Sequence, residues 1–167
     1  MLNPDSPLAQ LQRSPVRPGA VVWIGLRPGQ RQPVEPVQAA RITREGGLDG
    51  DHYASRVNSN RQVTLIGQQD LAAIASYLGL ERVDPSMLRR NIVVSGINLE
   101  SLKGCRVRLG SALLHITGEC APCSRMEEHF GVGGYNAVRG HGGITAQVIE
   151  GGDVRVGDSV TRVDDTA

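Results

Sequence analysis

The strongest chemical feature of the sequence is a pair of cysteines with C-x-x-C spacing in the segment GECAPCSRMEEHFG, residues 118–131. Pro122 suits the first position of a helix, which places Cys123 in the first helical turn. A thiol there faces backbone N–H groups, the positive end of the helix dipole and the charge of Arg125. These neighbours favour the thiolate, the nucleophilic and metal-binding form of cysteine. The competing interpretation is a buried cysteine that packs as a small apolar side chain.

The C-x-x-C spacing leaves two other chemistries open. It fits half of a structural zinc site, but such a site needs four ligands, and Cys105, His115 and His129 show no second paired spacing. It also fits a dithiol redox pair, although the chain lacks the strand–helix–strand context of a thioredoxin-like motif. We therefore expect Cys123 to be the catalytic or metal-ligating residue.

Three further segments suit a ligand site. His52 follows a glycine-rich loop at residues 46–51, where the backbone can approach a ligand closely. Arg89, Arg90 and Asn91 lie where a short helical turn enters a strand, so their side chains can point toward a bound anion, although the sequence does not fix the direction of Arg90. The alternative is that Arg89 and Arg90 are a solvated pair of charges. The loop RGHGG, residues 139–143, also suits close backbone approach. Phosphate-loop, dinucleotide-binding, zinc-protease and esterase motifs are absent.

Composition excludes several classes of protein. The 167 residues suffice for one domain, and 18 basic against 17 acidic residues give a net charge of +1, so nothing indicates nucleic-acid binding. No apolar run approaches 18 residues and no signal peptide opens the chain, so we expect no membrane and a cytoplasmic protein with reduced cysteines. Every basic residue except Lys103 is arginine, which suits the binding of planar or phosphate-like anions; genomic codon bias explains the same excess.

Short strands must position these residues. We expect strands at residues 20–26, 37–43, 61–66, 91–94, 106–109, 112–117, 144–149, 154–156 and 159–163. Two consecutive pairs, 106–109 with 112–117 and 144–149 with 154–156, should form hairpins.

Helical signals are few. An apolar stripe at i, i+3, i+4 and i+7 predicts a helix over residues 68–78 that ends at Gly79. Asp84 and Pro85 predict the start of a short helical turn that runs through Leu88.

The predicted fold class is mainly β with a few helices, closed into a glycine-rich β-barrel. Closure removes sheet edges that would otherwise aggregate, and alternating βα units are absent. We expect a flexible N-terminal arm at residues 1–19, a single domain at residues 20–163 and a tail at residues 164–167.

Taken together, these segments resemble the MOSC family, named after the C-terminal domain of molybdenum-cofactor sulfurases. The resemblance covers residues 20–163 and is carried by motifs in family order: GGLDGDHY (46–53), RQVTLI (61–66), LRRNIVVSG (88–96), LGSALLHITGECAPC (109–123) and RGHGGITAQVIEGGDVRVGDSV (139–160). It implies a closed barrel of the kind found in the small domain of pyruvate kinase.

The resemblance also implies roles for particular residues. The cysteine that matches Cys123 carries persulfide sulfur or ligates molybdenum, and the residues that match Arg89 and Asn91 contact the pterin–phosphate part of the cofactor. Arg61 and Gln62 are implied as pocket residues. His52 stands where relatives carry a charged or polar residue.

Three functions follow from the resemblance. The first is a molybdenum-cofactor-dependent reductase of N-hydroxylated compounds, which needs a separate electron donor because the chain has no ferredoxin-like extension. The second is a sulfur carrier that receives a persulfide on Cys123 from a cysteine desulfurase, and Cys120 is then an extra thiol that resolves the persulfide or packs. The third is a non-catalytic cofactor-binding module. Pyridoxal-phosphate chemistry is not expected, since Lys103 has no aminotransferase-like context. Substrate and oligomeric state stay undetermined.

Overall fold

The computed structural model describes residues 2–52 and 59–164. The strands are β1 (Gly19–Leu26), β2 (Glu35–Val37), β3 (Ala39–Thr43), β4 (Gly47–Leu48), β5 (Val63–Gly67), β6 (Ile92–Ser95), β7 (Arg106–Leu109), β8 (Ala112–Glu119), β9 (Ile144–Glu150), β10 (Gly152–Arg155) and β11 (Ser159–Val163). The helices are α1 (Pro7–Gln12), α2 (Gln68–Leu78), α3 (Pro85–Leu88), α4 (Arg125–Phe130) and α5 (Gly134–Val138), with 3-10 turns η1 (Ser59–Arg61) and η2 (Leu99–Leu102). Within these ranges no helix is long and apolar enough to cross a membrane.

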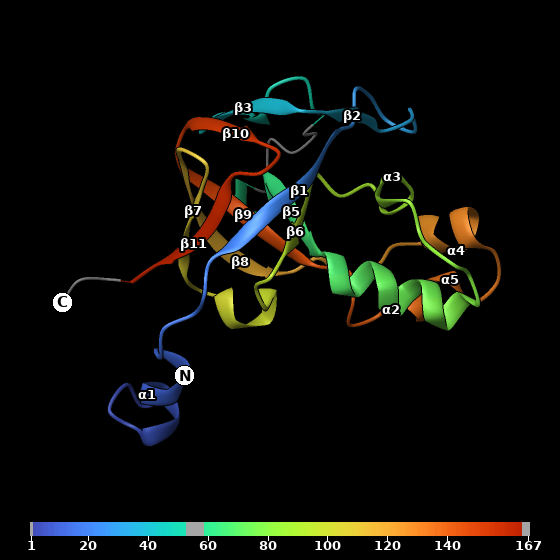
Figure 1. Cartoon of the computed structure of the whole chain (residues 1–167). Coiled ribbons are helices and arrows are strands. Elements are labelled where there is room, and N and C mark those ends of the chain that lie inside the picture. The colour runs from blue at the N-terminus through green and yellow to red at the C-terminus, as the bar shows by residue number, and fades with distance from the viewer. Residues whose placement is uncertain (1, 53–58, 165–167) are drawn as a thin grey trace.

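The main sheet closes on itself, which confirms the predicted mainly β barrel. Its strands follow the order β11-β7-β8-β9-β5-β6-β1, and β11 pairs with β1 to complete the ring. Neighbours in the ring are antiparallel except β5 and β6, which run parallel because α2 and α3 lie between them in sequence. A smaller sheet of β10, β3 and β4 lies at one end of the barrel (Figure 1).

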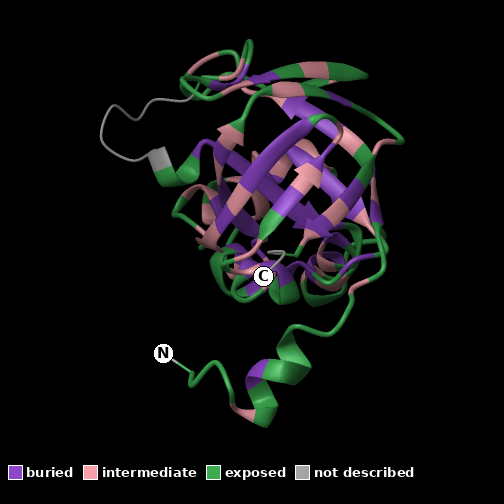
Figure 2. Ribbon diagram, turned by 90° about the vertical axis from the view of Figure 1, so that its left-hand side faces the viewer, coloured by how far each residue is buried: buried purple, intermediate pink, exposed green. Residues whose placement is uncertain are grey.

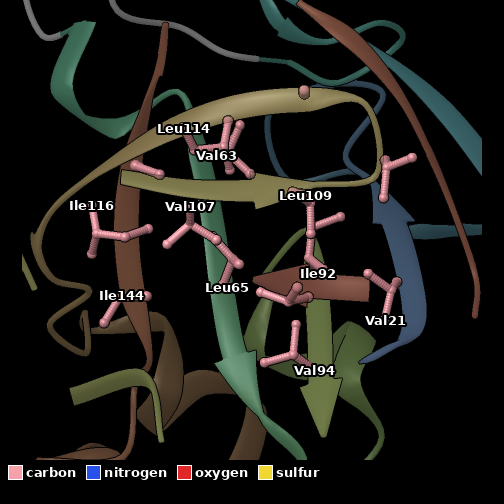
Figure 3. Close-up of a cluster of buried hydrophobic side chains, with 14 of the residues drawn as sticks. Val21, Val63, Leu65, Ile92, Val94, Val107, Leu109, Leu114, Ile116 and Ile144 are labelled. Carbon is pink, nitrogen blue, oxygen red and sulfur yellow. The ribbon is translucent and has the colours of Figure 1, made fainter. Parts of the chain in front are cut away.

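The core follows the two-residue alternation of the strands. Val63 and Leu65 of β5 and Ile92 and Val94 of β6 point into the barrel, where they pack with side chains from the opposite strands (Figure 3). Val93 of β6 and Ile66, its neighbour on β5, point outward into a second cluster beneath the helices. Helices α2, α3, α4 and α5 gather on this one side of the barrel (Figure 1), so the outer face of β5 and β6 is also buried.

One predicted hairpin and one predicted single strand are wrong, because of the way the strand edges pair. The hairpin of residues 144–149 with 154–156 does not form, because β9 already pairs with β8 and β5 on its two edges. Strand β10 pairs with β3 instead. The single strand predicted at residues 37–43 is two strands, since β2 stays with β1 and β3 leaves for the smaller sheet.

The N-terminal segment contains an element that the sequence pattern did not indicate. Helix α1 begins after Ser6, whose side chain accepts a hydrogen bond from the backbone of Ala9. Arg162 of β11 donates to three successive carbonyls, those of Gln12, Arg13 and Ser14, at 2.7–3.2 Å. The helix itself projects away from the barrel and is largely exposed (Figure 2). Residues 165–167 of the predicted tail lie outside the described residues.

Candidate cofactor-binding site

Cys123 is exposed and lies in the irregular segment between β8 and α4. The predicted helix start at Pro122 is wrong: α4 begins at Arg125, after the N-cap Ser124. The reason lies upstream, where the backbone N–H of Cys120 donates to the carbonyl of Gly143 at 2.8 Å and keeps the chain against the barrel. The turn into α4 comes only afterwards, when Met126 N–H donates to the Cys123 carbonyl at 3.0 Å. Cys123 therefore precedes the helix and does not occupy its first turn.

Arg89 lies within electrostatic range of Cys123 and of two other arginines. Arg89 caps the C-terminus of α3 with φ +57°, a left-handed conformation that turns the chain sharply into β6. Burial lowers the pKa of Arg89, and the positive charges of Arg125 and Arg27 lower it further. Negative charge on Asp51 and on Cys123 raises it. Arg89 is thus within electrostatic range both of two like charges and of an exposed thiol.

Arg89 also holds a neighbouring loop in place. Its Nη1 donates to the Gln32 carbonyl at 2.6 Å and its Nη2 to the Gly29 carbonyl at 3.5 Å. An arginine offers five N–H donors, so these two bonds leave donors of the guanidinium for a ligand.

Arg27 is anchored by a buried carboxylate. Its Nε and Nη2 contact the two oxygens of Asp51 at 3.0 and 2.7 Å, and its backbone N–H donates to the same carboxylate at 2.6 Å. The Asp51 side chain is fully buried, whereas that of Arg27 keeps 21% exposure. This two-pronged pair fixes the end of the glycine-rich loop against β1. His52, the next residue, is exposed and its backbone N–H donates to the Arg27 carbonyl at 2.5 Å.

Two more arginines surround Cys120, which is buried. Arg61, at the end of η1, places Nη2 at 3.9 Å from the Cys120 sulfur. Arg90 is itself buried and donates to the carbonyls of Gly142 at 2.7 Å, Leu88 at 2.9 Å and Cys120 at 3.3 Å. Arg90 therefore points inward and connects the cysteine segment with the residues that precede β6.

Asn91 and Gln62 are buried among backbone groups. The amide oxygen of Asn91 accepts from the Thr64 backbone and hydroxyl, both at 3.2 Å, and its amide nitrogen donates to the Gly25 carbonyl at 3.2 Å. Gln62 donates to the Arg44 carbonyl at 2.5 Å and accepts from Val148 N–H at 2.8 Å. These contacts cross-link neighbouring strands at the end of the barrel that carries the site.

The predicted residues thus separate into two groups. Cys123 and Arg89 lie within electrostatic range of each other, and Arg61 lies beside Cys120. Gln62 and Asn91 are buried, and their side chains bond to backbone groups of neighbouring segments. No local pattern in the sequence indicates Arg27, because its side chain is anchored by Asp51, 24 residues away.

A cavity of about 590 Å³ is lined by Cys120, Ala121 and Pro122 as well as by the loop RGHGG at residues 139–143. His141 from that loop contacts Asp70 through Nδ1 at 2.9 Å and the Tyr77 hydroxyl through Nε2 at 3.3 Å. Across the described residues, no three His, Cys, Asp or Glu side chains are arranged to hold a metal ion.

Comparison with solved structures finds the same fold. The chain is similar to the YUAD protein from Bacillus subtilis, with a TM-score of 0.74 and 21% identity over 87% of this chain and 96% of that one. It is also similar to YiiM from Escherichia coli (TM-score 0.66, 19% identity, 89% and 71% covered) and to YiiM from Geobacillus stearothermophilus (TM-score 0.72, 14% identity, 87% and 75% covered). No curated protein matches the chain.

The family is shown by sequence as well as by fold. A model of the MOSC domain matches residues 49–161, which is more than half of the chain and contains both cysteines of the C-x-x-C motif and the Arg89–Asn91 segment. With the closed barrel and the arginine-lined thiol already in place, the chain belongs to the MOSC domain family, which is known to bind the molybdenum cofactor.

Proposed function

We propose that this protein binds the molybdenum cofactor, with Cys123 as the protein ligand of the metal and the surrounding arginines as partners of its anionic part. The observation that supports this most is Arg89, which lies within electrostatic range of Arg27, of Arg125 and of the exposed thiol of Cys123. Like charges held close together repel one another, and a bound anion relieves that repulsion. The cofactor carries a phosphate and a dithiolene, so it is such an anion.

The donor types fit the group. Guanidinium forks bind phosphate through paired N–H bonds, and a soft metal centre with sulfur ligands accepts a further thiolate. Arg89 keeps donors for this purpose beyond its bonds to two carbonyls. When bound, the cofactor supplies two-electron chemistry at molybdenum.

The remaining predicted residues have different roles in this proposal. Asn91 and Gln62 hold β5, β6 and β9 in register, so they position the site from beneath. Arg61 lies at Cys120, and its positive charge extends the anion-binding surface toward the second thiol. His52, exposed next to the Arg27–Asp51 pair, is proposed as a residue at the edge of the cofactor site.

Cofactor analysis of protein made in a host that synthesises the molybdenum cofactor tests the proposal. We expect molybdenum and pterin to copurify with the wild type and to fall strongly in Cys123→Ser and Arg89→Ala. Cys105→Ser is the matched cysteine control and should stay loaded. Equal molybdenum in Cys123→Ser and wild type, or none in wild type while other molybdoenzymes of the host are loaded, contradicts the proposal.

A reductase of N-hydroxylated compounds is the activity we propose for the loaded protein. The chain's own residues bind and orient the cofactor, and we propose a separate protein as the electron donor. Loaded protein that retains molybdenum but shows no reduction with any electron donor indicates a non-catalytic binding module instead.

A sulfur carrier is the second candidate, and the second thiol favours it. Cys120 lies next to Arg61 and Arg90, so an anionic sulfur species at this segment meets positive charge on two sides. Incubation with a cysteine desulfurase and cysteine should then add one sulfur atom to Cys123 and none to the Cys123→Ser variant. Mass spectrometry of the intact chain distinguishes the two results.

A further inference from the structure

The segment Cys120–Cys123 joins a fixed thiol to an exposed one. Cys120 is held by its own backbone, since its N–H donates to Gly143 at 2.8 Å and its carbonyl accepts from Arg90 at 3.3 Å. Cys123 is exposed and lies three positions later, after Ala121 and Pro122. Neither cysteine belongs to a helix or a strand. Approach of the two sulfurs therefore requires no broken helix or sheet hydrogen bond.

Both thiols also lie in the field of one buried cation. Burial lowers the pKa of Arg90, whereas negative charge on Cys120 and on Cys123 raises it, which places both sulfurs within electrostatic range of the same guanidinium. Arg61 adds a second cation at 3.9 Å from the Cys120 sulfur. The thiolate is the form of cysteine that attacks a sulfur–sulfur bond.

We propose that Cys120 is the resolving thiol of Cys123, which releases sulfur from a Cys123 persulfide and leaves a Cys120–Cys123 disulfide. The inference deepens the proposed function, because it takes Cys123 as the reactive thiol of the site. The Cys120 thiolate attacks the inner sulfur of the Cys123 persulfide. The outer sulfur leaves as hydrosulfide, and the proton of the Cys120 thiol passes to solvent. Overall, the two cysteine thiols are oxidised to a disulfide, and the outer sulfur is reduced by the same two electrons to the level of sulfide.

The cycle is completed by a dithiol reductant, which returns the disulfide to two thiols. Disulfides in C-x-x-C segments close a short loop and are readily exchanged, which suits a catalytic role better than a structural one. The disulfide also occupies the Cys123 sulfur, so cofactor binding and sulfur release exclude each other in this proposal.

The test uses anaerobic, fully reduced wild type and the variants Cys120→Ser, Cys120→Ala and Cys105→Ser, each treated with inorganic polysulfide. We expect wild type and Cys105→Ser to release sulfide and to lose two hydrogens from the tryptic peptide 109–125, which contains both cysteines. The Cys120 variants should keep one extra sulfur on Cys123 for at least about tenfold longer, because an intramolecular thiol acts at high effective concentration. Circular dichroism verifies that they fold, and misfolding does not create a longer-lived persulfide.

Three results overturn the inference: equal persulfide lifetimes in wild type and both Cys120 variants, disulfides only between chains, or no uptake of sulfur by Cys123 in any protein. The failure of the proposed function is separate from these results. If Cys123→Ser retains molybdenum, cofactor ligation by Cys123 fails whatever the disulfide shows. If Cys120→Ser retains molybdenum like wild type and its persulfide decays as fast, only the resolving role fails.

Discussion

Two explanations of the Arg89–Asn91 segment differ in the role they give to Asn91. The family resemblance assigns it to the cofactor, whereas the structure buries it between β1, β5 and β6 with its side chain bonded to Thr64 and Gly25. We expect Asn91→Ala to destabilise the protein in the complete absence of cofactor. Removal of the amide leaves the buried backbone N–H of Thr64 without its acceptor, at a cost of about 1–3 kcal/mol, and each other lost bond contributes about 1 kcal/mol.

Together these contributions lower the free energy of unfolding by about 3–5 kcal/mol. For a domain of this size each kcal/mol shifts the melting temperature by about 2–4 °C, so we expect a decrease of about 6–20 °C. Urea unfolding followed by circular dichroism on cofactor-free protein measures the difference. Asn136→Ala is the matched control, because Asn136 is exposed and its side chain accepts one bond from Arg139 at 3.3 Å. That variant should stay within about 0.5 kcal/mol of the wild type.

Thr64→Val adds a second test, since it removes the hydroxyl that bonds to Asn91. The double variant should be less destabilised than the sum of the single ones, because both delete the same interaction. A free energy of unfolding within about 1 kcal/mol of the wild type, together with loss of the cofactor in Asn91→Ala, would mean that Asn91 contacts the ligand directly. That result would refute the reasoning from burial.

Two further predictions concern the segments around the site. Asp84 caps α3, and hydrogen bonds from Ser86 hold its pKa below the usual value, so Asp84→Ala should cost about 1 kcal/mol above pH 4. This difference should shrink as acid protonates the native carboxylate, and pH-dependent urea unfolding measures it; a constant difference down to pH 2 contradicts it. Gly143 has φ +85° and an added Cβ would lie 2.0 Å from the Leu65 carbonyl, so Gly143→Ala should prevent folding. Gly140→Ala, with φ +77° and open space, should cost about 1–3 kcal/mol, and equal yields of the two variants contradict the steric argument.

The sequence predicted elements whose signals are local. Helix α2 has an apolar stripe and a glycine stop, and its bounds match the prediction; β7, β8 and their hairpin turn are also where the pattern places them. The pairing of β10 was not predictable in this way, because it depends on which edges of β9 are already occupied by distant strands. The barrel closure followed from strand number and the cost of open edges rather than from any one segment.

The site shows the same division. The proximity of Cys123 and Arg125 follows from adjacent residues, but the pair of Arg27 and Asp51 joins residues that lie far apart along the chain. The direction of Arg90 was likewise undetermined, since its acceptors are carbonyls of segments that meet only after folding. Long-range polar contacts therefore account for most of what the sequence could not show.

X-ray absorption at the molybdenum edge tests the central claim most directly, because it counts the sulfur atoms bound to the metal. Loaded wild type should show one more sulfur ligand than any residual metal in Cys123→Ser, and that variant should hold far less molybdenum. Unchanged molybdenum content and an unchanged sulfur shell in Cys123→Ser would contradict ligation by this cysteine.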